Sequence, residues 1–122
     1  MGPIILVMPY IGKNLSVNSY RLSGKKGQQY LIKSSVKGWM VELAKKAEEL
    51  KYLNLSPPLV ITVSSKFLDR LNSVDPDNLS KVICDALERG LGMNDKDFRY
   101  RVGTVAYGYT DPILEIEVSK EV

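Results

Sequence analysis

Histidine is absent from the 122-residue sequence, and cysteine occurs once, at Cys84. Without histidine neither a Ser-His-Asp nor a Cys-His catalytic system can form, and the commonest general base of enzymes is missing. A single cysteine permits no internal disulfide and, with no histidine beside it, no conventional zinc site. The chemistry that remains is that of the acidic residues.

Long apolar runs and phosphate-binding glycine motifs are also missing. The run from Ile4 to Met8 is too short for a signal peptide or a membrane span, so we expect a cytoplasmic protein with no membrane partner. Neither GxxxxGK[ST] nor a GxGxxG after a strand is present. The length and the composition, 44% hydrophobic and 25% charged, predict one globular domain over residues 1–122.

Charge is unevenly distributed along the chain. From Met1 to Lys46 eight lysines and arginines accompany one acid, Glu42, whereas the remainder is net acidic. A basic region beside an acidic one suits a protein that attracts a polyanion with one part and holds a cation with the other. Surface lysines that serve only solubility give the same pattern.

Apolar spacing predicts a short strand, a helix and a second strand in the first part of the chain. The strand at Ile4 to Met8 is followed by a polar, basic loop from Tyr10 to about Gln29. Ser34 or Ser35 can cap the helix, which buries a stripe that includes Trp39. The run Leu59 to Val63 is typical of a buried strand.

The second part predicts another helix and two further strands. The helix runs from about Asn78 to Arg89, with Gly90 as its stop signal. Strands at Val102 to Tyr109 and at Ile113 to Val118 surround a turn at "TDP". We therefore predict an α+β fold in which a small mixed β-sheet is covered by two helices.

Three acids flank the second predicted helix: Asp75 and Asp77 precede it, and Asp95 follows it. Taken alone, "DPDN" is typical of a turn whose acid caps the next helix. An EF-hand loop is excluded, because its sixth position is Ser80 and its twelfth is Ala86.

The same helix carries a line of charges. Lys81 lies four residues after Asp77, and Asp85 lies four after Lys81, so acid, base and acid share one face. A salt-bridged surface helix has this pattern too. The two glycines in "GLGMN" allow the chain to fold back, which carries Asp95 toward the sheet.

The acidic stretch "DPDNLSKVICDAL" followed by "GMND" resembles the RusA family of Holliday junction resolvases. The motif of that family has the form DxDNxxK, with a downstream DAL and a paired-acid element. The segment "SVNSYR" is similar to an SVNxxYR-like segment of the family, and the predicted order of elements matches over nearly the whole chain.

The resemblance implies Asp75, Asp77 and Asp95 as magnesium ligands, with Mn²⁺ as a substitute, and Lys81 as the basic partner at the scissile phosphate. Carboxylate oxygens are the ligands that magnesium prefers, so the ligand set is chemically sensible. The sequence departs from the family at two positions. Asn94 stands where the first acid of the downstream pair is usual, and Val74 stands where an arginine often precedes the motif.

DNA contacts are expected from the basic loop and the first helix. The candidates in the loop are Asn18, Tyr20, Arg21, Lys25 and Lys26, of which the two lysines lie between glycines in "SGKKG".

The implied function is that of a magnesium-dependent, structure-selective endodeoxyribonuclease. It would resolve Holliday junctions by paired phosphodiester hydrolysis that leaves 5′-phosphate ends, in recombination and repair. A DNA-binding dimer that holds branched DNA without cutting it stays open as the alternative, with the acids as turn and cap.

A homodimer is expected because paired cuts need two active sites and the chain has one acidic cluster. The strand at Ile113 to Val118 and the helix around Trp39 are the candidate interfaces.

Overall fold

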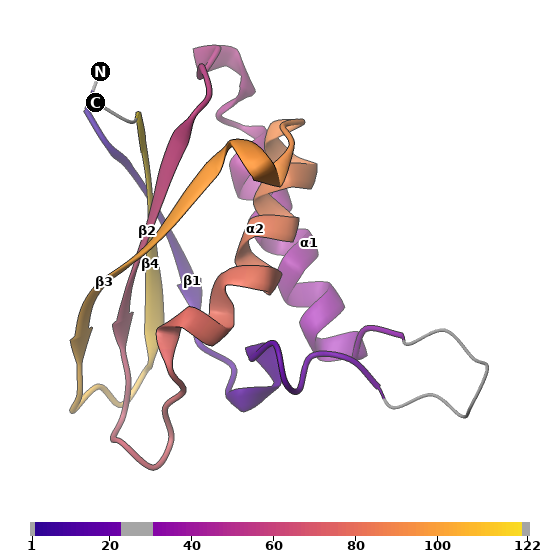
Figure 1. Cartoon of the computed structure of the whole chain (residues 1–122). Helices are drawn as coiled ribbons and strands as arrows, with labels where there is room; N and C mark the ends of the chain where they lie inside the picture. The colour runs from indigo at the N-terminus through magenta and orange to yellow at the C-terminus, as the bar shows by residue number, and fades with distance from the viewer. Residues whose placement is uncertain (1, 23–30, 121–122) are drawn as a thin grey trace.

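A computed structural model of the chain describes residues 2–22 and 31–120. Four strands form one sheet in the order β1, β4, β2, β3, and their bounds are β1 Ile4–Pro9, β2 Leu59–Lys66, β3 Phe98–Ala106 and β4 Ile113–Lys120. The helices α1 (Ser34–Glu48) and α2 (Ser80–Leu91) lie together on one side of this sheet (Figure 1). The predicted α+β fold, a small mixed sheet covered by two helices, is confirmed.

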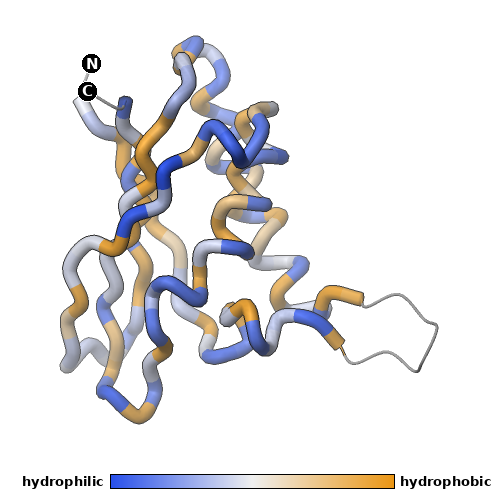
Figure 2. Tube along the Cα trace, viewed as in Figure 1, coloured by the Kyte–Doolittle hydropathy of each residue, from blue (hydrophilic) through white to orange (hydrophobic). Residues whose placement is uncertain are grey.

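The core lies between the sheet and the two helices. Along β4, Leu114, Ile116 and Val118 are buried, whereas the two glutamates between them are only half-buried. This is the alternation of a strand with one face on the core. Hydrophobic and hydrophilic residues also follow one another along both helices (Figure 2). There the buried residues recur every three or four positions, so each helix buries one stripe.

The pairing of the last two strands differs from a hairpin around the "TDP" turn. β4 pairs antiparallel with β1 and with β2, and β3 pairs parallel with β2, so β2 separates β3 from β4. The strand β3 also begins at Phe98 rather than at Val102 and ends at Ala106. Just beyond it Gly108 has a φ of 91°, a left-handed conformation that interrupts the extended chain before Tyr109.

Helix α1 begins at Ser34 and buries the predicted stripe. Its N-cap is Lys33, and no side chain caps its first turn, so the expected cap by Ser34 or Ser35 is wrong. The buried indole of Trp39 donates a hydrogen bond from Nε1 to the carbonyl oxygen of Pro9 at 2.6 Å. Trp39 therefore ties the helix to the end of β1 and belongs to the core of the monomer.

Helix α2 continues past the glycine that was expected to stop it. Gly90 lies inside the helix and is buried, and a Cβ atom on it would collide with the carbonyl oxygen of Ala44 and lie 2.7 Å from Cβ of Ala47. The helix ends instead at Gly92, whose φ of 68° is the left-handed conformation of a C-terminal cap. Gly90 thus serves the close approach of α2 to α1.

Both candidate dimer interfaces are occupied within the chain. β4 lies inside the sheet between β1 and β2, so Ile113 to Val118 offers no free edge. The helix face around Trp39 packs on the core. In the described sheet the outer strands are β1 and β3, and any edge-to-edge contact between two copies must use one of these.

No helix among the described residues is long and apolar enough to cross a membrane.

Replacing Gly90 with alanine tests the contact between the helices. Alanine is the better helix former, but its methyl group would overlap with Ala44 and Ala47, so we expect a loss of about 1–3 kcal/mol in the free energy of unfolding. Gly38→Ala in α1 is the matched control, because a Cβ atom there meets nothing within 4 Å. Urea unfolding should show Gly38→Ala equal to or more stable than the parent chain; equal gains from both substitutions would contradict the close contact.

Candidate functional site

The acidic turn is a short 3₁₀ helix, η3 (Pro76–Leu79), with Asp75 as its N-cap. One carboxylate oxygen of Asp75 accepts a hydrogen bond from the backbone N–H of Asp77 at 3.1 Å. Pro76 fits the first position of the turn, since its missing N–H is not needed there. The capping role expected for "DPDN" is therefore present. The exposed carboxylate of Asp77 takes no part in that hydrogen bond.

Tyr100 attaches this turn to the sheet. From β3 its hydroxyl donates a hydrogen bond to the carbonyl oxygen of Pro76 at 2.6 Å. Burial raises the pKa of Tyr100 above its usual value, and the nearby Cys84, Asp77 and Asp75 add to the rise. Both acids of the turn therefore lie close enough to Tyr100 to act on its hydroxyl electrostatically.

A cavity of about 270 Å³ lies beside the turn, along α2. Its lining consists of Ser80, Lys81, Cys84, Asp85, Asp95, Phe98 and Tyr100. Within it, Nζ of Lys81 lies 3.2 Å from each carboxylate oxygen of Asp85. That hydrogen bond raises the pKa of Lys81 against a smaller effect of burial, and the charges of Asp85, Tyr20 and Asp95 raise it further. Lys81 is therefore a cation at neutral pH.

Asp95 enters the cavity from the other end of α2. It begins the 3₁₀ helix η4 (Asp95–Asp97), and its backbone N–H donates to a carboxylate oxygen of Glu88 at 2.7 Å. Asn94 is the N-cap of η4, and its side-chain oxygen accepts from the N–H of Lys96 at 3.0 Å. Asn94, at the position where the RusA-like pattern usually has an acid, thus has a local structural role.

The predicted catalytic residues lie around the two ends of α2, but among the described residues they do not converge on one point where they could bind a single metal ion. Asp75 and Asp77 lie at the start of α2, Asp95 lies beyond its end, and Lys81 and Tyr100 lie between them. In the described part of the chain, no three side chains of Asp, Glu or Cys are placed to hold one metal ion together. Asp95 therefore lines the cavity together with Lys81, whereas Asp75 and Asp77 are not part of its lining and lie near it on the side of Tyr100.

Three residues of this surface were not anticipated. Tyr100 positions the acidic turn, Glu88 positions Asp95, and Cys84 lines the cavity with a thiol whose pKa is raised to about 12, chiefly by burial. Glu88 carried a usable signal, because it follows Lys81 and Asp85 on the same helical face. Tyr100 carried none, since its partner is a backbone carbonyl from a distant part of the chain.

The first part of the basic loop packs against the acidic turn. The backbone N–H of Val17 donates to the carbonyl oxygen of Asn78 at 2.7 Å. Asn18 and Arg21 are exposed, as a DNA contact requires. Tyr20 is only 3% exposed, so little of its side chain is open to a DNA contact. Its buried ring instead supports Arg21, whose guanidinium carbon lies 4.9 Å from the ring centroid.

The lysines Lys25 and Lys26 lie outside the described residues. The segments on either side of them pair with each other through an antiparallel bridge between Arg21 and Ile32.

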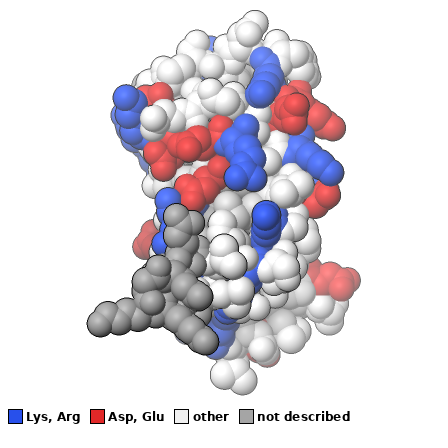
Figure 3. All heavy atoms as spheres, turned by 90° about the vertical axis from the view of Figure 1, so that its right-hand side faces the viewer, with Lys and Arg blue, Asp and Glu red and all other residues white. Residues whose placement is uncertain are grey.

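The basic and acidic parts of the sequence do not form separate basic and acidic surfaces near the helices. Figure 3 shows acidic and basic side chains interleaved there.

Comparisons with known proteins give no family. No protein-family model matches the sequence, and no curated protein matches it. Among solved structures, the chain is similar to the periplasmic domain of Helicobacter pylori MotB, with a TM-score of 0.46 and 16% sequence identity over 97% of this chain and 81% of that one. At that level the likeness assigns neither a family nor a function to the chain.

Tyr100→Phe tests the attachment of the acidic turn. The substitution leaves the carbonyl of Pro76 without its donor, so we expect the free energy of unfolding to fall by about 1 kcal/mol. Tyr52→Phe is the control, since Tyr52 is 78% exposed. The pKa of Tyr100 is raised in the folded state, so its contribution is present below pH 10 and declines above it. Urea titrations should show the gap between parent and Tyr100→Phe narrowing above pH 10; a gap independent of pH would contradict the assignment.

Proposed function

We propose that the protein is a magnesium-dependent, structure-selective endonuclease that cuts branched DNA, with the four-way junction as its substrate in recombination and repair. The observation that carries the proposal is that Tyr100, which is hydrogen-bonded to the acidic turn, lines one cavity together with Lys81 and Asp95. The residues at this surface include those of the RusA-like motif DxDNxxK. A substrate of this kind also agrees with the expected cytoplasmic location.

Magnesium fits the donor chemistry of this surface. The ion takes oxygen ligands, usually one or two carboxylates together with waters and substrate phosphate oxygens, so a closed cage of three acids is not required. Asp77 keeps its carboxylate exposed, and Asp75 uses one of its two oxygens as a cap. These two residues would hold the ion, and Asp95 would complete the acidic surface. When bound, the ion supplies an acidified water and stabilises charge on the phosphate.

Lys81 is suited to stabilise negative charge on the scissile phosphate. Its raised pKa keeps the ammonium charged at neutral pH, so it can bind a nonbridging phosphate oxygen or protonate the leaving group. Its hydrogen bond to Asp85 orients the side chain within the cavity. Asp85 therefore has a positioning role in the proposed reaction.

The basic loop would hold the DNA backbone close to this surface. Its described part is attached to the acidic turn by the hydrogen bond from Val17 to Asn78. Arg21 is exposed at the point where the loop continues toward Lys25 and Lys26, the two proposed phosphate contacts. A phosphate bound by Arg21 would lie on the part of the loop that is attached to the acidic turn.

A second function is favoured by the cap at Asp75 and by the open arrangement of the acids. A dimer that binds branched DNA without cutting it would need Asp75 only for the turn, and it would need no metal. Cleavage of a labelled four-way junction, with and without magnesium, distinguishes the two functions. The enzyme cuts only with the ion, and the binding protein cuts under neither condition.

Asp77→Asn separates catalysis from structure. The carboxylate is exposed and outside the capping hydrogen bond, so we expect the melting temperature to stay within about 1 °C of the parent value. Junction cleavage should fall by at least about 100-fold, because the ion loses a charged ligand. Junction binding in metal-free buffer should be equal or tighter, since one negative charge near the DNA is removed.

Glu48→Gln is the control for net charge. Glu48 is exposed on α1 and far along the chain from the acidic turn, and the substitution changes the net charge equally. It should leave cleavage unchanged. If Asp77→Asn instead lowers binding and thermal stability together while cleavage per bound junction stays constant, the residue belongs to the turn and not to a metal site.

A homodimer is the expected active form, because one acidic surface per chain cannot make two symmetric cuts. Light scattering coupled to size exclusion should give about twice the chain mass of 13.7 kDa. Both nicks in a cruciform plasmid should appear within one binding event. A stable monomer that nicks once and dissociates would contradict junction resolution and would indicate a simpler branch nuclease.

A further inference from the structure

A second surface lies at the end of the sheet where β2 and β3 finish. It combines apolar and aromatic side chains that are unusually open to solvent: Leu71 is 80% exposed, Tyr107 is 42% exposed and Tyr109 is 40% exposed. Leu68 is also exposed, and its carbonyl oxygen accepts a hydrogen bond from the N–H of Gly108, the residue between the two tyrosines. Contiguous exposed apolar side chains commonly mark a binding surface. We call these four residues, together with Arg70, the strand-end platform.

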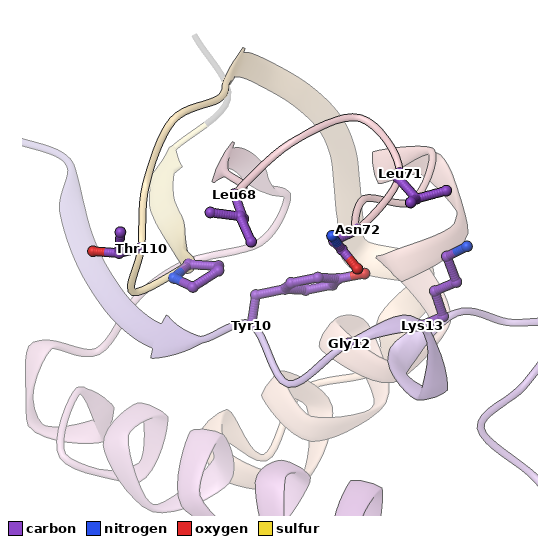
Figure 4. A pocket seen from close by; sticks show the side chains of 8 residues that line it. Tyr10, Gly12, Lys13, Leu68, Leu71, Asn72 and Thr110 are labelled. Atoms are coloured by element: carbon purple, nitrogen blue, oxygen red, sulfur yellow. The ribbon is translucent and has the colours of Figure 1, made fainter.

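A cavity of about 520 Å³ adjoins the platform (Figure 4). Leu68, Leu71 and Pro112 give it apolar walls, the ring of Tyr10 lies across its floor, and Lys13 and Asn72 add polar groups at one end. The volume is within the range of ligand pockets, and the mixture of apolar walls with few polar groups is typical of them. A flat, largely apolar group with polar edges fits such a cavity.

The platform is rigidly supported from below. Phe67 is fully buried, and its ring contacts Tyr10 edge-on at 4.9 Å and Tyr107 at 6.2 Å between centroids. Backbone hydrogen bonds join the segment after β3 to the segment after β2. The N–H of Gly108 donates to the carbonyl oxygen of Leu68 at 2.9 Å, and the N–H of Tyr109 donates to that of Phe67 at 3.1 Å. A surface fixed in this way loses little freedom when it binds a ligand.

Cations accompany both exposed tyrosines. The guanidinium carbon of Arg70 lies 5.5 Å from the ring centroid of Tyr107. Nζ of Lys66 lies 5.6 Å from that of Tyr109 and is ion-paired with Glu115 at 3.0 Å, so Arg70 is the main basic group of the platform. Aromatic rings beside basic groups form the surface on which proteins stack unpaired bases, because bases offer flat faces and the backbone that joins them is anionic. A guanidinium plane can itself stack on a base.

We propose that the strand-end platform and its cavity bind unpaired bases of single-stranded DNA, such as those beside a branch point. Only Ser73 and Val74 separate Asn72, at the cavity, from Asp75, at the acidic turn. Bases held on the platform would therefore lie beside the surface that carries the acids. The branch-point context rests on the proposed function, whereas the stacking of bases does not depend on cleavage.

The test measures binding of a fluorescently labelled oligo-dT and of a fully paired duplex of equal length, in metal-free buffer with the full chain. Tyr107→Leu keeps an apolar side chain but removes the ring. Stacking is worth roughly 1–3 kcal/mol per base, so affinity for oligo-dT should fall at least about fivefold, and affinity for the duplex should change less than twofold. Tyr52→Leu replaces a tyrosine that lies outside the platform and is more exposed than Tyr107. It should change neither the affinity for oligo-dT nor the affinity for the duplex.

A second variant distinguishes a loss of binding from a loss of folding. Leu71→Ser alters a residue that is almost wholly exposed, so it cannot disturb the core, and it should also weaken oligo-dT selectively. Equal losses on oligo-dT and duplex would mean that the platform contacts only phosphates and would overturn the proposal. So would unchanged oligo-dT binding in both variants, or no binding of oligo-dT by the parent chain.

The outcome is separable from that of the nuclease proposal. If the parent chain binds oligo-dT through Tyr107 but never cuts a junction, the base-binding proposal is supported and the endonuclease proposal is contradicted. If the chain cuts junctions but its binding of oligo-dT is insensitive to Tyr107→Leu and Leu71→Ser, the endonuclease proposal is supported and the base-binding proposal is contradicted.

Discussion

The parallel pairing of β2 with β3 is the constraint on which the rest of the structure depends. Parallel neighbours cannot be joined by a tight turn, so the chain must return across the sheet before β3 can begin. Helix α2 makes that return, with the acidic turn before it and Asp95 after it. β3 then runs beside β2 in the same direction, and its Tyr100 reaches the carbonyl of Pro76. The candidate site is therefore a direct result of the crossover, and Gly90 lets the crossover helix α2 pack closely on α1.

Local patterns predicted the elements better than their connections. The alternation in Ile113 to Val118 and the stripe around Trp39 each reflect burial on one face, and both are present in the structure. Gly90 was mistaken for a helix end because its role is contact with α1, which local sequence does not encode. The insertion of β4 between β1 and β2 is equally nonlocal, since alternation identifies a buried face but not a neighbouring strand.

At the candidate site, sequence located the acids but could not decide their role. A carboxylate that caps a turn and one that holds a metal use the same oxygen atoms, and Asp75 already uses one of them for the N–H of Asp77. The exposed carboxylate of Asp77 is free of that requirement. Tyr100 acts through a backbone carbonyl of a distant segment, so no motif could reveal it, whereas Glu88 shares a helical face with Lys81 and Asp85 and could have been found from that spacing.

The segment between β2 and α2 connects the two surfaces physically. At one end Phe67 is fixed by the backbone of β3 and by its aromatic neighbours, and at the other Pro76 is fixed by Tyr100. Along this segment the exposed Leu68 and Leu71 come first and the acidic turn follows. A displacement of this segment would move the cavity wall and the acids together. The spacing between a bound base and the acidic surface is thus set by one short stretch of chain held at both ends.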